Sequence, residues 1–265
     1  MNKLLQKIGV GIAVIAIGMA STAVPALAAI TIVVTPADTQ GWSEADTRPG
    51  GDVNFVADSE APGGSGALQL TTDSTTTAKA QYMHAADENT LLSDITELSY
   101  STKQTSADFV DGAPSYQLPV LLNGTTGFTT LVYEPYQNGD VESGVWQSWD
   151  VDEGQFWSSR SVTCSNGSVA AGGGGEPFYT LSDIQTMCPE AVVAGFGVNV
   201  GSNNPSYDVS ADLVNFDGTI FDFELFKTPS NKEQCKKDGW KDLKDSSGNA
   251  FKNQGQCVSY FNNTQ

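Results

Sequence analysis

Histidine is almost absent from this chain of 265 residues, in which His84 is the only one. A metalloprotease motif of the His-Glu-x-x-His type is therefore impossible, and no Gly-x-Ser-x-Gly segment supplies the nucleophile of an α/β-hydrolase. His84 lies at the end of a predicted strand, where we expect a structural or solvent-facing role. The sequence thus lacks the residues of these common hydrolytic centres.

Basic residues are also scarce in the body of the chain. Residues 29–228 contain five basic side chains against 27 acidic ones, a balance of −22, whereas residues 229–265 contain six lysines against four acids, a balance of +2. A body this acidic repels phosphate backbones, so we expect no nucleic-acid partner. For most of the acids the simplest interpretation is that they keep an extracellular protein dispersed.

Long apolar runs are limited to one segment, residues 8–20, which is too short to span a bilayer. Lys3 and Lys7 precede it, and Ala26-Leu27-Ala28 follows it. A charged start, an apolar core and small residues at the end are typical of a secretory signal peptide. We therefore predict that residues 1–28 are removed on export, that no transmembrane segment remains, and that the protein is secreted or held at the cell surface.

Cysteines are few, and none forms a Cys-x-x-Cys pair. The four are Cys164, Cys188, Cys235 and Cys257, which allow three pairings. In an exported chain we expect disulfides rather than metal binding or catalysis. Pairing Cys164 with Cys188 and Cys235 with Cys257 would close two loops of similar size.

Helix signals are sparse, and turn residues divide the body into short extended segments with alternating apolar positions. Residues 117–122 and 128–133 flank a glycine-bounded hairpin loop, and Phe196, Val198 and Val200 share one face of a later strand. One helical turn is expected at residues 183–188. Ten or so short strands separated by turn residues predict an all-β protein, an antiparallel β-sandwich over residues 29–228.

Three segments resemble the first and last strands of bacterial extracellular jelly-roll modules, a group that includes many carbohydrate-binding modules. They are Gly66-Ala67-Leu68-Gln69-Leu70-Thr71-Thr72, residues 195–201, and Asp212-Leu213-Val214 continuing through Asp217-Gly218 to Phe221-Asp222-Phe223-Glu224. The resemblance covers about a quarter of the body. It implies a jelly-roll fold and says less about the ligand, because this sandwich carries many functions.

The composition changes after Thr228-Pro229-Ser230, where lysines appear and hydrophobic strands stop. Residues 235–257 resemble a short C-terminal motif of secreted bacterial proteins, in which Cys and Gly-Trp are followed by Phe-Lys-Asn-Gln-Gly and a second Cys. The usual Gly-Gly-Trp is replaced by Asp238-Gly239-Trp240. We expect residues 229–265 to form a small disulfide-stapled appendage that either retains the protein at a surface or caps its C-terminus.

Aromatic and amide side chains are concentrated in the middle of the body. Aromatic rings pack on sugar C–H faces, and amides or carboxylates bind the hydroxyls. The sequence therefore predicts a non-catalytic module that binds an extracellular polysaccharide or cell-envelope glycan. The proposed ligand-binding residues are Tyr133, Tyr136, Gln137, Asn138, Trp146, Trp149, Asp150 and Trp157. Trp146 and Trp149 are an odd number of residues apart, so only one of them faces inward in a regular strand.

Two alternatives remain open. One is a structural or adhesive surface protein without a small ligand, in which the tryptophans are all buried. The other is a glycoside hydrolase, which needs two carboxylates. The best acidic run, Asp150-Val151-Asp152-Glu153, lacks a pair of glutamates on one strand face, which argues against this class.

No cofactor is expected apart from a structural calcium ion, which the jelly-roll resemblance implies. Such an ion is held by oxygen ligands between an early loop and the final strand. By position the resemblance nominates Asp58 and Glu60 early in the chain and Asp208 and Asp212 late in it.

Overall fold

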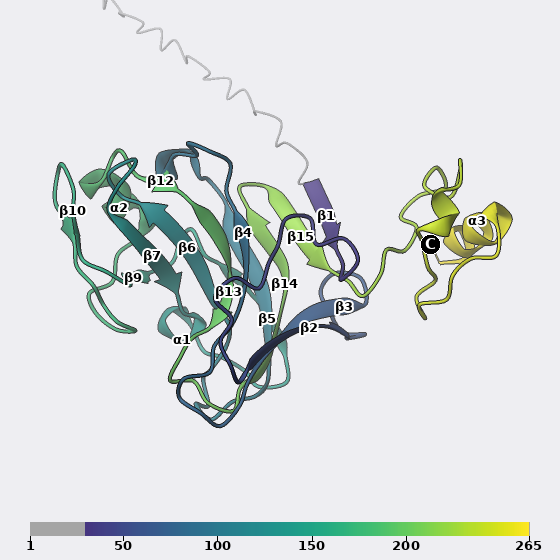
Figure 1. Cartoon of the computed structure of the whole chain (residues 1–265), viewed down its shortest axis with the longest axis horizontal. Coiled ribbons are helices and arrows are strands. Elements are labelled where there is room, and N and C mark those ends of the chain that lie inside the picture. Colours follow the sequence, from purple (N-terminus) through teal and green to yellow (C-terminus); the bar gives the residue numbers. More distant parts are fainter. Residues whose placement is uncertain (1–29, 265) are drawn as a thin grey trace, which may run out of the picture.

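The computed structural model describes residues 30–264, so the predicted signal peptide lies outside the described residues. These residues form a sandwich of two β-sheets with a small C-terminal unit beside it (Figure 1). The all-β sandwich expected from the sequence is confirmed. No helix among residues 30–264 is long and apolar enough to cross a membrane.

The first sheet is built around β14, which contacts strands on both of its sides. Its strands are β1 (Ile30–Val34), β2 (Gly51–Ala57), β3 (Gly66–Thr72), β5 (Leu98–Ser106), β8 (Trp146–Asp150), β14 (Asp208–Phe216) and β15 (Thr219–Phe223). On one side β14 pairs with β3 and then with β15, and on the other side it pairs with β5, which pairs with β8. All these pairs are antiparallel. The expected antiparallel arrangement has one exception, since β1 runs parallel to β15.

The second sheet has the order β4-β13-β6-β7-β9, with the short β12 beside β6. Its strands are β4 (Ala80–Ala85), β6 (Ser115–Leu121), β7 (Phe128–Tyr133), β9 (Phe156–Ser158), β12 (Val192–Val193) and β13 (Gly195–Val200). The hairpin predicted from the glycine-bounded loop is the β6–β7 pair, with Leu121 opposite Phe128. A separate two-stranded hairpin joins β10 (Val162–Thr163) to β11 (Ser168–Val169).

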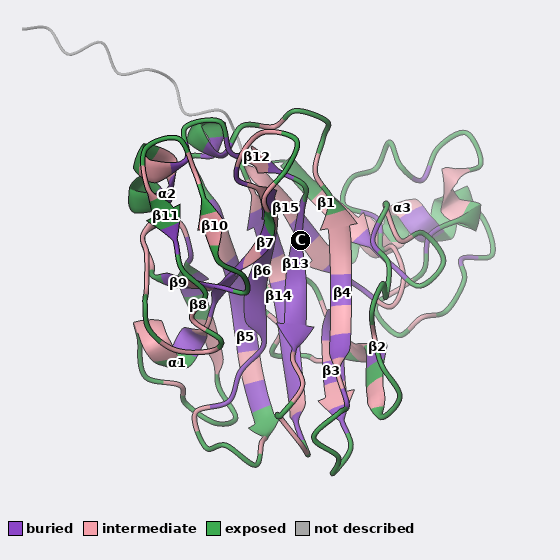
Figure 2. Cartoon of the chain, turned by 60° about the vertical axis from the view of Figure 1, so that its left-hand side comes forward, coloured by how far each residue is buried: buried purple, intermediate pink, exposed green. Residues whose placement is uncertain are grey.

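Aromatic rings fill much of the space between the sheets. Trp42 is 2% exposed and stacks on Tyr82, with ring centroids 5.5 Å apart. The edges of Phe221 and Phe223 contact the same indole. Burial of rings of this size is a main source of the folding free energy, and Figure 2 shows buried residues concentrated in the central strands.

Strand alternation places side chains as predicted in β13, where Phe196 and Val198 enter the core. In β15, Phe221 and Phe223 are buried as expected. Strand alternation would place Glu224 on the solvent face, opposite Phe223, but it is only 6% exposed. The reason is that β15 ends at Phe223, and the next residue turns under the loop before β3, where the backbone N–H of Ser65 donates to its carboxylate at 2.7 Å.

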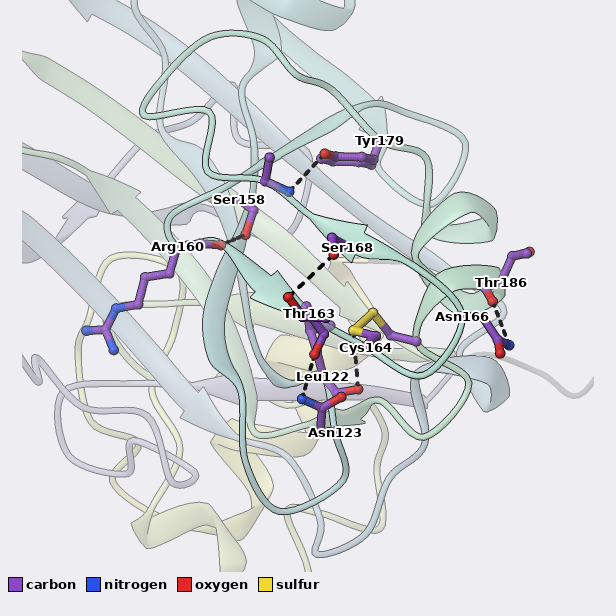
Figure 3. The surroundings of a disulfide bond; sticks show 12 residues. Leu122, Asn123, Ser158, Arg160, Thr163, Cys164, Asn166, Ser168, Tyr179 and Thr186 are labelled. Carbon is purple, nitrogen blue, oxygen red and sulfur yellow. Dashed lines mark hydrogen bonds between the residues drawn. A yellow bond between two sulfur atoms is a disulfide. The ribbon is translucent and has the colours of Figure 1, made fainter.

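The helices of the sandwich are short: η1 (Leu92–Asp94), α1 (Pro135–Asn138) and α2 (Leu181–Met187). The expected turn before Pro189 is α2, where Thr180 and Asp183 form a reciprocal capping box. Cys188 at its C-terminal end is bonded to Cys164, which follows β10 (Figure 3). This disulfide attaches the β10–β11 hairpin to the helix.

The C-terminal unit has its own hydrophobic cluster around the second disulfide, Cys235–Cys257, so the local pairing of all four cysteines is confirmed. Its helices are η2 (Gly239–Lys241) and α3 (Gln254–Asn263). The sequence did not lead us to expect α3, although Asn253 caps it by accepting from the Gln256 N–H. Asp238 has φ of 70°, so an aspartate adopts the left-handed turn that a glycine would favour.

Candidate functional site

A groove of about 720 Å³ lies on the outer face of the second sheet. It extends from β4 at one edge of this sheet to β9 at the other. Its floor comes from outward-facing positions of β4, β13, β6 and β7, and loops on both sides form its walls. β13 beneath it is buried along its whole length, whereas β4 alternates between buried and half-buried residues (Figure 2).

The floor of the groove is rich in side-chain amides. Asn199 donates to Gln81 Oε1 at 3.0 Å, and Gln81 in turn donates to the carbonyl of Ala45 at 2.8 Å. Gln117 donates to Ser115 Oγ at 2.7 Å. These bonds orient the amides, which carry both donors and acceptors and therefore suit ligands with many hydroxyl groups.

Aromatic side chains form the wall near β9. Trp157 is half-buried on β9, and Tyr136 in α1 is 38% exposed. Phe109 is 44% exposed and contacts the Tyr136 ring edge-to-face, with centroids 5.2 Å apart. The Tyr136 hydroxyl donates to the carbonyl of Gly174 at 3.2 Å, which fixes the ring. Rings held in this way can contact the apolar faces of a sugar.

Glu134 lies in the groove next to this aromatic wall. Glu134 is half-buried, and the loss of solvent around its carboxyl raises its pKa from 4.5 to about 8. The Trp157 indole offsets part of that rise. Its Nε1 is nevertheless buried without a properly aligned hydrogen bond to any described residue. At neutral pH the Glu134 carboxyl is thus mostly protonated and can donate a hydrogen bond.

The opposite end of the groove, near β4, carries charged side chains. Lys79 and Arg48 both form ion pairs with Asp46. Hydrogen bonding to Lys79 lowers the pKa of Asp46 despite some burial, so this carboxylate is ionised. Arg48 also donates to Ser202 Oγ at 3.0 Å. Both cations are therefore held at the wall.

Two of the eight predicted ligand-binding residues, Tyr136 and Trp157, line the groove. Gln137 and Asn138 lie beside it in α1 and have structural hydrogen bonds. Gln137 donates to the carbonyl of Gly174, and Asn138 donates to the carbonyl of Gln155.

The other four predicted residues are elsewhere. Tyr133 and Trp149 are 2% and 8% exposed, so their rings belong to the core. Trp149 is opposite Tyr100 on the inner face of the first sheet and donates to Thr102 Oγ1 at 2.8 Å. Trp146 and Asp150 are on that sheet's outer face, away from the groove, as the odd spacing of the tryptophans implies. None of these four residues lines the groove, and their role in ligand binding stays a prediction.

The four nominated calcium ligands do not share one site. Asp58 and Glu60 both contact Lys103 Nζ at 3.0 Å. Asp208 accepts from Gln69, and Asp212 is fully buried, accepting from the N–H groups of Gly63 and Phe223. Among residues 30–264, no three His, Cys, Asp or Glu side chains are arranged to hold a metal ion. The calcium ion, whose ligands would include backbone carbonyls as well as carboxylates, therefore stays a prediction.

Several groove residues escaped the sequence-based prediction, namely Gln81, Phe109, Gln117, Glu134, Arg160 and Asn199. Asn199 could have been found, because alternation places it opposite the core face of its strand. Glu134 lies between Tyr133 and Pro135, and a single acid in an acidic chain gives no signal of its own. The others come from separate strands and loops that only the sheet order brings together.

No protein-family model matches the chain, and no curated protein matches it. Among solved structures, it is similar to a family 11 carbohydrate-binding module from Clostridium thermocellum in complex with a β-1,3-1,4-mixed-linked tetrasaccharide. This pair has 12% identity over 68% of this chain and 91% of the module, with a TM-score of 0.40.

A family 22 xylan-binding domain from Paenibacillus barcinonensis is similar at 14% identity over 69% of this chain and 85% of that domain, with a TM-score of 0.33. A β-1,2-glucanase from Parabacteroides distasonis is similar at 13% identity over 66% of this chain and 23% of the enzyme, with a TM-score of 0.34.

Proposed function

We propose that the protein is a non-catalytic binding module for extracellular or cell-surface glycans, and that the groove on the second sheet is the binding site. The observation that carries the proposal is the combination of Trp157, Tyr136 and an amide floor in one groove. A sugar presents apolar faces and a rim of hydroxyls, so its binding sites need both kinds of group.

The shape of the groove supports a polymer as the ligand. It crosses the sheet from β4 to β9, which is four strand spacings or about 19 Å. A path of that length accommodates several sugar units of one chain. A single monosaccharide would leave most of it unused.

The placement of carboxylates favours binding over hydrolysis. The acids that line the groove are Glu134 and Asp46. Glu134 directly follows β7, and Asp46 pairs with Lys79, which directly precedes β4, so they are separated by three strand spacings, about 14 Å along the sheet. The two carboxyls of a glycosidase are roughly 5–10 Å apart. Asp152, from the acidic run at residues 150–153, is not in the groove. Its carboxylate accepts a hydrogen bond from the Leu98 N–H on the first sheet.

A structural or adhesive protein without a small ligand has less support. That alternative requires the tryptophans to be buried, and Trp157 is half-buried at the groove surface. Export to an oxidising compartment remains part of the proposal, since two disulfides are formed.

The test compares two tryptophan variants in affinity electrophoresis through gels that contain neutral or acidic polysaccharides. Trp157→Ala should weaken retardation at least tenfold on whichever polymer the native protein binds, equivalent to about 1.4 kcal/mol. Trp146→Ala is the matched control, because this half-buried indole is on the other sheet. Thermal melting checks that both variants fold. Unchanged retardation of Trp157→Ala, or no retardation of the native protein on any polymer, would contradict the proposal.

A further inference from the structure

Three of the five basic residues in the acidic body line the groove. The five are Arg48, Lys79, Lys103, Arg160 and Lys227, and the groove contains Arg48, Lys79 and Arg160. The same body carries 27 acids, of which only Asp46 and Glu134 line the groove. The charge of the groove is thus opposite to that of the protein around it.

The ionisation states of Asp46 and Glu134 increase the difference in charge between the groove and the rest of the body. Asp46 is ionised but shared between Lys79 and Arg48. Burial raises the pKa of Glu134 to about 8, so this carboxyl is mostly neutral at pH 7. Three cations then face one ionised carboxylate along the groove.

Arg160 differs from the other four basic residues of the body, because it has no carboxylate partner. Arg48 and Lys79 pair with Asp46, Lys103 with Asp58 and Glu60, and Lys227 with Asp38. None of the salt bridges among residues 30–264 involves Arg160. In a body with so large an excess of acid, an arginine without an acidic partner is an unusual arrangement.

The position of Arg160 is nonetheless fixed. Its N–H donates to Thr129 Oγ1 at 3.0 Å, and its carbonyl accepts from Ser158 Oγ at 2.8 Å. Its guanidinium lies over the Phe128 ring, 5.2 Å from the centroid. Figure 3 shows the side chain pointing away from the disulfide and its hairpin. Five N–H donors are therefore presented at the groove on a backbone that is already ordered.

From these observations we propose that the groove selects acidic polysaccharides, specifically chains of uronate units, and that Arg160 binds a uronate carboxylate. Guanidinium groups bind carboxylates through paired hydrogen bonds. Arg48 and Lys79 would lower the electrostatic energy of further carboxylates toward the β4 end. This inference rests on the proposed glycan-binding function and names the class of glycan.

The test uses polygalacturonate and the same polymer after chemical reduction of its carboxyl groups, which leaves the sugar chain neutral. Isothermal titration calorimetry on the mature protein, at pH 7 and low salt, should give at least tenfold tighter binding to polygalacturonate. Arg160→Gln should remove most of that difference. Lys227→Gln is the matched control, because it changes the net charge equally at a residue outside the groove. Raising the NaCl concentration should weaken the binding of polygalacturonate more than that of the reduced polymer.

The possible failures are distinguishable. Equal or tighter binding to the reduced polymer, or binding only to neutral glucan or xylan, would overturn the uronate inference and leave the glycan-binding proposal intact if Trp157→Ala still abolishes it. An equal loss in Arg160→Gln and Lys227→Gln would show a general charge effect and also overturn the role of Arg160. Absence of binding to every acidic and neutral polymer would contradict both proposals.

Discussion

Glu134 shows how burial of one side chain can affect both stability and the chemistry of the groove. Its carboxyl lies next to Trp157, and desolvation raises its pKa to about 8. The titratable groups that interact with it are Tyr100, Tyr136 and Tyr207, whose own pKa values are raised by burial, so they remain neutral while Glu134 ionises. Glu134 therefore titrates as an isolated buried acid.

This environment leads to a prediction about pH and stability. The folded protein keeps the Glu134 proton up to a pH of about 8, whereas the unfolded chain releases it near 4.5. The stability contribution is present in full below pH 4.5 and is lost as the pH rises through 8. Urea unfolding should thus give a lower free energy of unfolding at pH 9 than at pH 5.

The variant Glu134→Gln isolates this contribution. It should reduce the loss of stability between pH 5 and pH 9, and it should be more stable than the native protein at pH 9. Some pH dependence should remain, because burial raises the pKa of Asp212 to about 7. An identical pH profile for the variant and the native protein would show that Glu134 does not carry a buried proton.

At the scale of single elements, the loop before β3 is packed tightly against the end of β15. Gly64 in this loop has φ of +54°, and a Cβ built on it would be 1.5 Å from Glu224 Oε1. Gly218, in the turn between β14 and β15, has φ of +82° with nothing within 4 Å of such a Cβ. The two glycines share a left-handed backbone and differ in the space around them.

We expect Gly64→Ala to be the more destabilising of two otherwise matched substitutions. Gly218→Ala should cost about 1 kcal/mol of unfolding free energy, from backbone strain alone. Gly64→Ala should cost at least 1 kcal/mol more, because the Glu224 carboxylate must move and lose its bond to the Ser65 N–H. Denaturant unfolding of both variants measures the difference. Equal costs would show that the loop adjusts freely.

The disulfide at the β10–β11 hairpin gives a second prediction at this scale. Cys164 and Cys188 are 24 residues apart, and a loop of that length corresponds to about 3 kcal/mol of chain entropy. Replacing both by serine should lower the unfolding free energy of the sandwich by about that amount. The corresponding double variant at Cys235 and Cys257 is the control, since that pair is in the separate C-terminal cluster. It should leave the main unfolding transition unchanged, and an equal drop in both variants would contradict this.

Local sequence patterns predicted the elements whose determinants are close together in the chain. Alternation placed Phe196 and Val198 in the core, and the glycine-bounded loop gave the β6–β7 hairpin. Strand alternation alone would expose Glu224, but this residue is buried by a loop some 160 residues earlier in the chain. It also missed α3, because the helix has few apolar residues and depends on the Cys257 disulfide and the Asn253 cap.

On the scale of the whole molecule, the groove depends on the order of the strands in the second sheet. Local sequence patterns do not predict this order. Gln81, Gln117 and Trp157 belong to strands that are adjacent only through the arrangement β4-β13-β6-β7-β9. Two aromatic residues of the site could still be predicted, since Tyr136 and Trp157 are in the aromatic-rich central stretch. Tyr133 and Trp149 share that composition but face inward, so composition alone could not separate groove rings from core rings.

The C-terminal unit remains a predicted appendage with its own small core and no part in the groove. It contacts the end of the sandwich segment through Lys244, whose N–H donates to the carbonyl of Lys227 and whose Nζ lies 5.5 Å from the centroid of the Phe226 ring. Glycan binding should therefore be independent of this unit. The lysines of this unit are a second place where an acidic polymer can bind. A measurement of binding therefore has to distinguish this unit from the groove.

The most direct measurement is an NMR titration of the mature protein, with the tryptophan indole N–H signals observed while oligogalacturonate is added. Trp157 should shift and saturate, together with the side-chain amide signals of Gln117 and Asn199. Trp146 on the other sheet and Trp240 in the C-terminal unit should not move. Shifts at Trp146 or Trp240 with Trp157 unaffected would contradict the assignment of the groove as the glycan-binding site.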